Sequence, residues 1–354
     1  MAVSRINEAG LNVNQYGNRN LIINGAMQVA QRGEARTVSD GGAEGFQTLD
    51  RFAFYYANSA GGVATISQDT TVPSGYGFSK SYKVDVATAD TSISATHMIY
   101  ISHKVEAQNI RNSGWDNTNT SSYITLSFWA RSAKAGVYNA ILRTADVGAK
   151  YYPVEYKLVA DTWKNVIVTI PGEPSLDFND DTGSGLDSRW NHQLGTDRDN
   201  GTAGQWNATD AGNSGTSNQV NFFDHVDNNF FLTGVQLEVG DTATDFEHRT
   251  FADELQRCSR YFQAIHYVNG SNISVGTVHA TSSGAIPMHY TNGEMRATPT
   301  ITMPATGQTS GTVSLLNASS AYPSTTGSHT STAANNQNYV IVARSNVGLT
   351  AAGQ

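Results

Sequence analysis

The feature that most constrains the fold is a two-residue alternation of apolar and polar side chains in short runs. In the clearest run, residues 121–132, alternate positions would form one apolar face of a strand: Ile124, Leu126, Phe128 and Ala130. The run 163–170 repeats the pattern less cleanly. An alternation with this period predicts half-buried β-strands, each covering a core with one face.

Similar runs recur along most of the chain, separated by turns that contain Gly, Asn or Pro. In the first two thirds we predict strands at 46–57, 62–70, 79–88, 95–106, 121–132, 136–145, 151–159, 163–170 and 229–239. Further strands are predicted at 262–268, 272–280, 284–291, 298–303, 310–316 and 337–344. Many short strands with frequent turns favour an all-β chain built from antiparallel sandwiches.

The polar surface of this chain is unusually poor in charge. Charged residues make up 15% of the 354 residues, and the formal net charge is -8. Asn, Thr, Ser, Gly and Gln provide the polarity instead, and they favour turns and strands over helices. The acidic balance argues against a nucleic-acid partner, which would require a basic face for phosphates. A composition of this kind is common in extracellular assemblies and virion proteins.

Three further absences narrow the class of protein. The single cysteine, Cys258, has no partner in the chain for a disulfide. No apolar run approaches the roughly 18 residues that a membrane-spanning helix needs, so we expect no membrane insertion. The first residues, 1–5, carry no apolar core of the signal-peptide type. We therefore expect synthesis in a cytoplasm, followed by release as part of a virion.

Changes in pattern along the chain divide it into four parts. Residues 1–45 are predicted to be an extended polar N-terminal arm, and 46–249 an antiparallel β-sandwich domain. Residues 250–262 are predicted to be a linking helix, and 263–354 a second, small β-sandwich domain. Residues 171–228 and 318–337 are predicted to be long polar loops.

The predicted helix has a recognisable start and an apolar stripe. Thr250 is suited to cap it, with Asp253 three residues later as the capping-box acid. Its apolar positions recur at helical spacing: Phe251, Leu255, Cys258 and Phe262. We expect Cys258 to be a buried packing residue on this stripe.

An acidic cluster in the loop 171–228 allows three readings. Its members are Asp177, Asp180, Asp181 and Asp187. Solvated loop residues are the first reading, a calcium site is the second, since Ca²⁺ takes oxygen ligands, and a glycosidase carboxylate pair is the third. The spacing fits no EF-hand loop. We expect no cofactor, and calcium stays open as the alternative.

The same loop carries residues suited to carbohydrate. Trp190 and Trp206 offer flat rings for the C–H faces of sugars, and Asn207 offers an amide for hydrogen bonds. The alternative is that each tryptophan packs at the edge of the sandwich or at a subunit interface. No nucleotide-binding, Ser-hydrolase or zinc motif occurs, and the nine histidines have no metal-binding spacing.

Several segments, in order, resemble structural proteins of tailed bacteriophages. The opening NLIINGAMQVAQRG (residues 20–33) resembles their "NLLINGxxxxxQRG", and DRF (50–52) and SFWARS (127–132) resemble the motifs that follow. DTW (161–163) and the turn TIPG (169–172) are similar to the next strand pair. The block from FLTGVQLEVG (231–240) through FEHR (246–249) to CSRYF (258–262) resembles the most recognisable part of the pattern.

The resemblance implies a tail-fibre or virion appendage protein in which residues 46–249 form a jelly-roll domain similar to carbohydrate-binding modules, followed by a second small β domain. It implies a non-enzymatic homotrimer on the virion that attaches to a host-surface polysaccharide. Other tail or capsid proteins would bind the N-terminal arm through the short apolar segment Leu21, Ile22 and Ile23. Two alternatives remain open: a capsid or tail decoration protein that binds only virion proteins, and, more remotely, a polysaccharide depolymerase.

Overall fold

A computed structural model describes residues 19–266, apart from 41–44, 58–60, 147 and 209–210. Beyond residue 266 it describes 278–279, 283–284, 295–296, 300–302, 312–315, 325–328 and 340–344. The first 18 residues of the predicted arm therefore lie outside the described residues.

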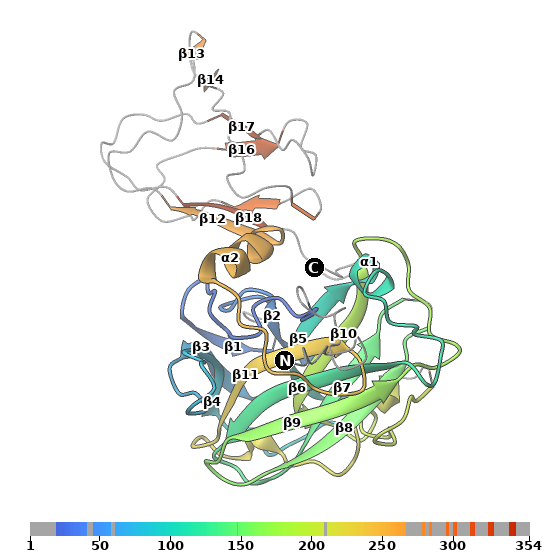
Figure 1. Cartoon of the computed structure of the whole chain (residues 1–354). Coiled ribbons are helices and arrows are strands. Elements are labelled where there is room, and N and C mark those ends of the chain that lie inside the picture. The colour runs from blue at the N-terminus through green and yellow to red at the C-terminus, as the bar shows by residue number, and fades with distance from the viewer. Residues whose placement is uncertain are drawn as a thin grey trace, which may run out of the picture.

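Two antiparallel sheets form the body of the molecule (Figure 1). The six-stranded sheet has the order β1-β3-β4-β11-β6-β9. Its strands are β1 (Ala35–Ser39), β3 (Val63–Asp69), β4 (Ser81–Thr88), β11 (Asn229–Val239), β6 (Tyr123–Ser132) and β9 (Lys164–Pro171). The five-stranded sheet has the order β2-β5-β10-β7-β8. Its strands are β2 (Phe52–Ala57), β5 (Met98–Glu106), β10 (Ser184–Leu194), β7 (Gly136–Thr144) and β8 (Tyr151–Leu158). The predicted all-β sandwich of the jelly-roll type is confirmed.

The core lies between the sheets and is rich in aromatic rings. The predicted apolar face of β6 is completely buried, with Ile124, Leu126, Phe128 and Ala130 at 0% exposure. From the opposite sheet, the Trp190 ring meets the Phe128 ring edge-on, with centroids 5.7 Å apart. Because side chains alternate in direction along each strand, each sheet packs one apolar face against the shared core.

The nine strands predicted between 46 and 239 all exist, with ends that differ by a few residues. One strand was missed, because β10 lies inside the predicted loop 171–228. Its polar residues Asp187, Asn191 and Gln193 are buried by tertiary contacts, so its sequence carries no apolar alternation. The loop prediction is wrong for this segment.

The described part of the predicted N-terminal arm belongs to the sandwich. Ile22, Met27 and Val29 are buried in it, and β1 pairs with β3. Residues 20–25 lie in this segment outside any strand. Asn24 instead has a positive φ of 63°, and a Cβ on Gly25 would lie 2.1 Å from the Val235 carbonyl oxygen, so glycine permits this close approach.

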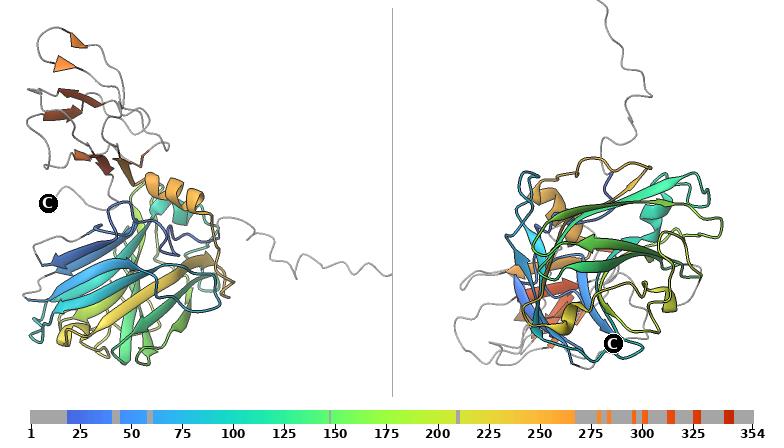
Figure 2. Two further views of the ribbon diagram at one scale, coloured as in Figure 1. Left: turned by 90° about the vertical axis from the view of Figure 1, so that its left-hand side faces the viewer. Right: turned by 90° about the horizontal axis from the view of Figure 1, so that it is seen from below.

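Two short helices flank the sheets. α1 (Ala107–Arg111) follows β5, and α2 (Phe251–Ser259) lies across one end of the sandwich (Figure 2). The predicted cap is present, since the Thr250 hydroxyl accepts a hydrogen bond from the Asp253 backbone N–H. The predicted stripe is only partly correct, because Phe251 is 55% exposed and Phe262 has left the helix for β12. Cys258 is buried, as predicted.

Beyond α2, strands pair in three small sheets. β12 (Phe262–His266), β18 (Val340–Arg344) and β15 (Thr300–Thr302) form one sheet. β13 (Val278–His279) pairs with β14 (Ser283–Gly284), and β16 (Thr312–Leu315) with β17 (Thr325–Ser328). β17 lies in the predicted loop 318–337, which is a second loop that contains a strand. Among the described residues, no helix is long and apolar enough to cross a bilayer.

A buried histidine makes the stability of the core depend on pH. His192 lies among the rings of Phe54, Phe222 and Phe230, and its Nδ1 lies 3.0 Å from the Trp190 carbonyl oxygen. Burial lowers its pKa to about 3. In the window between the unfolded pKa near 6.5 and the folded value, the unfolded chain binds one more proton at this residue, so acid favours unfolding.

We therefore expect His192→Phe to change how stability varies with pH. Between pH 6 and 4 this histidine should cost the wild type about 1.4 kcal/mol of unfolding free energy per pH unit. Urea unfolding at several pH values should give a slope that is shallower by this amount in His192→Phe. His225→Phe, which removes an exposed histidine, serves as the control. Equal slopes for His192→Phe and the wild type would contradict the assignment.

Candidate functional site

The outer face of the five-stranded sheet carries an ordered array of tyrosines and charged residues. Because Phe54, Ile101 and Trp190 point into the core, their strand neighbours point outward. We call this set the tyrosine–cation face: Tyr55, Tyr100, Lys104, Arg143, Tyr151, Asp187 and Arg189.

Strand register places these residues in rows across the sheet. Tyr55 of β2 lies opposite Tyr100 of β5. Four positions further along β5, a second row runs Lys104–Asp187–Arg143–Tyr151 across β5, β10, β7 and β8, and Arg189 lies between the rows. Since neighbouring strands lie about 4.8 Å apart, this row across four strands spans about 14 Å. That length suits an extended ligand.

Rings and cations pack on one another over this face. The Tyr55 and Tyr100 rings lie 5.5 Å apart, and the Arg189 guanidinium lies 4.6 Å from the Tyr100 ring centroid. The Arg143 Nε donates a hydrogen bond to the Tyr151 hydroxyl at 3.2 Å. Such contacts hold long side chains in place before a ligand arrives.

Asp187 organises the centre of the face. One carboxylate oxygen accepts a hydrogen bond from the Ser102 hydroxyl at 2.6 Å, and the other accepts from Arg189 Nε and Nη2, both at 2.7 Å. Burial raises the pKa of this carboxyl, but the charges of Arg189 and Lys104 outweigh burial and hold it below its usual value. Asp187 is therefore an anion that positions Arg189.

A polar loop covers the far part of the sheet. The Asn139 carboxamide oxygen accepts from the Thr216 backbone N–H at 3.0 Å, and the Asn191 amide donates to the Ser214 carbonyl at 2.8 Å. Glu155 of β8 accepts from both Thr216 and Asn218. The loop thus covers the part of the Tyr55–Tyr100 row that continues across β10, β7 and β8. Five members of the face stay partly exposed: Tyr55, Tyr100, Lys104, Arg143 and Arg189.

The expected glycan contact Trp190 is not at the surface. Its side chain has 0% exposure and packs against Phe52 and Phe128 in the core. No part of the ring faces solvent, so the prediction that Trp190 contacts a glycan is wrong. Trp190 was assigned to a loop because β10 was missed.

Trp206 and Asn207 lie at the edge of β8 and hold the loop in place. The Trp206 Nε1 donates to the Pro171 carbonyl at 2.8 Å, and its ring meets Tyr152 edge-on. The Asn207 amide group donates to the Thr202 and Gln205 carbonyls, and its oxygen accepts from the Thr202 backbone N–H. Their assignment as glycan contacts stays a prediction, and the structure gives both a packing role.

The four aspartates of the acidic cluster do not converge. Asp177, Asp180 and Asp181 are exposed, whereas Asp187 is buried on the tyrosine–cation face. Asp181 uses one oxygen to accept the Gly183 backbone N–H. Within the described part of the chain, no group of three or more His, Cys, Asp or Glu residues is arranged to hold a metal ion. A calcium site built from these four residues is therefore wrong.

The expected attachment segment is part of the sandwich. Ile22 has 0% exposure, and Leu21 and Ile23 are partly buried. The Leu21 N–H donates to the Leu237 carbonyl, and the Ile23 N–H lies 3.3 Å from His103 Nε2. Ile22 is therefore unavailable to a partner, whereas attachment of another virion protein through Leu21 and Ile23 stays a prediction.

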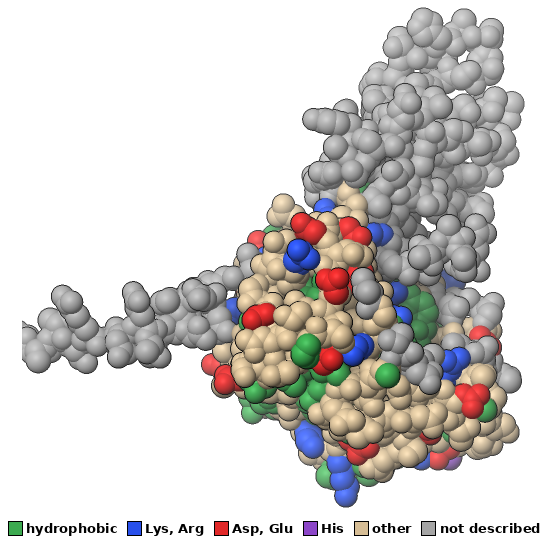
Figure 3. All heavy atoms as spheres, turned by 90° about the vertical axis from the view of Figure 1, so that its right-hand side faces the viewer, with side chains coloured by type: hydrophobic (Ala, Val, Ile, Leu, Met, Phe, Trp, Pro, Cys, Tyr) green, Lys and Arg blue, Asp and Glu red, His purple; other side chains and the backbone are tan. Residues whose placement is uncertain are grey.

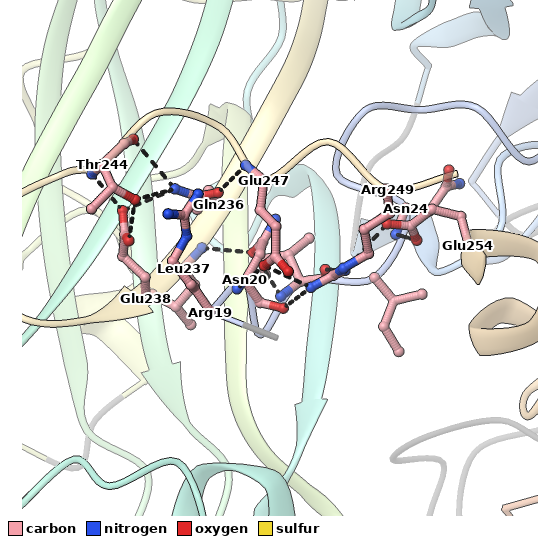
Figure 4. A network of polar contacts seen from close by, with 12 residues as sticks. Arg19, Asn20, Asn24, Gln236, Leu237, Glu238, Thr244, Glu247, Arg249 and Glu254 are labelled. Carbon is pink, nitrogen blue, oxygen red and sulfur yellow. Dashed lines mark hydrogen bonds and ion pairs between the residues drawn. The ribbon is translucent and has the colours of Figure 1, made fainter. Parts of the chain in front are cut away.

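The phage-like motif residues form a buried polar network between distant segments (Figure 4). Arg249 donates to the Asn20 and Ile22 carbonyls and pairs with Glu247 and Glu254. Glu254 of α2 also accepts the Asn24 backbone N–H at 2.7 Å. The network joins the first described residues to the end of β11 and to α2. These residues of the motif series therefore act in the architecture of the sandwich.

Sequence reasoning missed five members of the face: Tyr55, Tyr100, Lys104, Arg143 and Arg189. The sequence signal for them is weak, because Tyr55 and Tyr100 lie 45 positions apart and each looks like an ordinary strand residue. Only the strand register brings them together.

No protein-family model matches the chain, and no curated protein matches it. Similar solved structures include the enzymatically active domain of tailspike protein 4 from bacteriophage CBA120, with 10% identity and a TM-score of 0.31 over 54% of this chain and 19% of that chain. A CBM4 structure matches with 13% identity and a TM-score of 0.32, over 62% of this chain and 99% of that one.

The family 11 carbohydrate-binding module from Clostridium thermocellum, solved with a mixed-linked β-1,3-1,4 tetrasaccharide, matches with 10% identity and a TM-score of 0.29. The alignment covers 61% of this chain and 98% of that module. This chain thus spans about a fifth of the tailspike structure and nearly all of the two modules. At these identities and TM-scores no role of any residue is carried over to this chain.

Proposed function

We propose that this chain is a non-enzymatic phage virion protein, a tail-fibre or fibre-tip subunit, whose sandwich binds a host-surface glycan through the tyrosine–cation face. The observation that carries the binding proposal is the partly exposed set Tyr55, Tyr100 and Arg189, held rigid on a sheet. Tyrosine rings offer apolar faces for sugar C–H groups, and arginine supplies several donors for hydroxyl oxygens.

A binding role is favoured over hydrolysis by the state of the carboxylates. Glycosidases use two carboxyl groups, one of which must stay protonated to act as an acid. On this face Asp187 is buried and ionised beside Arg189, and Glu155 is bonded to Thr216 and Asn218. Neither carboxyl group is arranged to deliver a proton.

The virion assignment rests on the order of the phage-like motifs along residues 20–262. We propose that the chain is a homotrimer, because several weak glycan sites in one particle would give firm attachment. Gold-labelled antibody against this chain, imaged on intact phage particles, tests the position. Label on the capsid would favour the decoration-protein alternative, and light scattering that gives a stable monomer would contradict the trimer.

We expect Tyr100→Ala to weaken glycan binding at least about tenfold, because it removes an apolar ring face and the support for Arg189. A glycan array identifies a binding oligosaccharide, and calorimetry with that oligosaccharide measures the loss. Tyr55→Ala should weaken binding in the same direction.

The matched control is Tyr123→Ala on β6, a partly exposed tyrosine of the opposite sheet. It should bind like the wild type. An unchanged affinity in both Tyr100→Ala and Tyr55→Ala would place the binding site elsewhere and contradict the proposal.

A further inference from the structure

The tyrosine–cation face has more positive than negative charge, although the whole chain carries -8. Lys104, Arg143 and Arg189 lie around one carboxylate, Asp187, which leaves an excess of 3 - 1 = +2. Farther along β8, Glu155 and Lys157 offset each other. A local positive excess on an acidic protein favours the binding of a negatively charged group.

Two of the three cations have no carboxylate partner. Asp187 is committed to Arg189 and Ser102, and in the described part of the chain no ion pair involves Lys104 or Arg143. Both are only partly exposed. Burial lowers the pKa of Lys104, as do the nearby charges of Arg189 and Arg143, although Asp187 opposes this change. The positive charge of the Lys104 ammonium group is therefore not fully balanced by the negative charge of Asp187.

The strand register shows where a bound anion would balance this positive charge. In the row Lys104–Asp187–Arg143 the two cations lie on strands that flank β10, on either side of Asp187. Facing residues of neighbouring antiparallel strands have Cα atoms about 4.5–5.5 Å apart, so an oxyanion above the row lies within reach of both long side chains. Guanidinium and ammonium groups form their strongest hydrogen bonds with such oxyanions.

We propose that the glycan bound by this face is acidic, a saccharide that carries carboxylate or sulfate groups, and that Lys104 and Arg143 bind those groups. This inference rests on glycan binding by the same face. A nucleic-acid backbone does not fit, because it would require an extended basic surface on a chain that is acidic overall.

The experiment compares three probes by calorimetry on the full chain: an oligouronate, a sulfated oligosaccharide and a neutral β-glucan oligosaccharide of similar length. An acidic probe should bind more tightly than the neutral one, and its affinity should fall as the salt concentration rises. Preference for the oligouronate or for the sulfated probe distinguishes the two anionic groups.

Two variants assign the preference to residues. Lys104→Met and Arg143→Met keep the apolar stems but remove the charges, and each should weaken binding of the acidic probe about tenfold or more. The loss should be larger for the acidic probes than for the neutral probe, because only the acidic probes lose an ionic contact. Lys164→Met, on the opposite sheet, is the control and should bind like the wild type.

The outcomes separate this inference from the function on which it rests. Equal affinity for neutral and acidic probes, unaffected by Lys104→Met, would overturn the acidic specificity and leave glycan binding intact. Inorganic phosphate that binds as tightly as the acidic saccharides would also overturn it, since the sugar would contribute nothing. Binding of none of the three saccharides would overturn both.

Discussion

Arg249→Met should destabilise the protein by about 3–5 kcal/mol, because it leaves buried carboxylates without their cation. The Arg249 side chain is 6% exposed, and its partners Glu254 and Glu247 are 7% and 17% exposed. Its loss also removes the donors to the Asn20 and Ile22 carbonyls, so four acceptors lose a charged donor together. Urea unfolding followed by tryptophan fluorescence measures the change.

Arg131→Met provides the comparison for a surface ion pair. Arg131 pairs with Asp161, whose side chain is 62% exposed, and water can solvate either charge when the other is removed. Its loss should cost less than about 1 kcal/mol. Arg249→Lys should fall between the two, since an ammonium keeps the charge but cannot serve all four acceptors. A loss for Arg249→Met as small as for Arg131→Met would show that the network in Figure 4 does not hold the segments together.

Trp190→Ala should be about as damaging, at about 3–5 kcal/mol, because it opens a large cavity where the two sheets meet. The Trp190 ring contacts Phe52 and Phe128, and no loop can collapse into the space between two paired sheets. Trp190→Phe should cost less, since part of the ring volume remains. Thermal or urea unfolding gives both values.

The same variants test the role of Trp190 in binding. If Trp190 acts only in packing, the folded fraction of Trp190→Phe should bind saccharide with the wild-type affinity. Trp206→Ala is the matched change at a half-buried tryptophan and should destabilise the chain less. A Trp190→Phe variant of normal stability that lost binding would restore Trp190 as a ligand contact and contradict its burial.

The low density of charge on the surface was predictable from the composition of the sequence. Figure 3 shows a described surface made mostly of uncharged atoms, with scattered Lys, Arg, Asp and Glu side chains. That agrees with a chain in which only 15% of residues are charged. What composition could not show is that cations gather on one sheet face, because the average charge hides any local excess.

The strands with clean alternation were predictable because side-chain direction is a local property. In β6, Ile124 to Ala130 lie on the buried face that their spacing requires. β10 was not predicted because its outward residues are polar yet buried: the Asn191 amide bonds to the loop at Ser214, and Asp187 lies between Lys104 and Arg143 of the neighbouring strands. Burial of that kind depends on partners far away in the sequence.

By itself the sequence determined that the chain is a β-sandwich, where most strands lie, and that α2 begins after Thr250. It also carried the motif series, but it could not show that those residues form a structural junction. Only the tertiary structure decided which strands are neighbours and in which register. The candidate site therefore depends on the tertiary structure. Tyr55 meets Tyr100, and Lys104 and Arg143 flank Asp187, only through pairing between strands that lie far apart in the sequence.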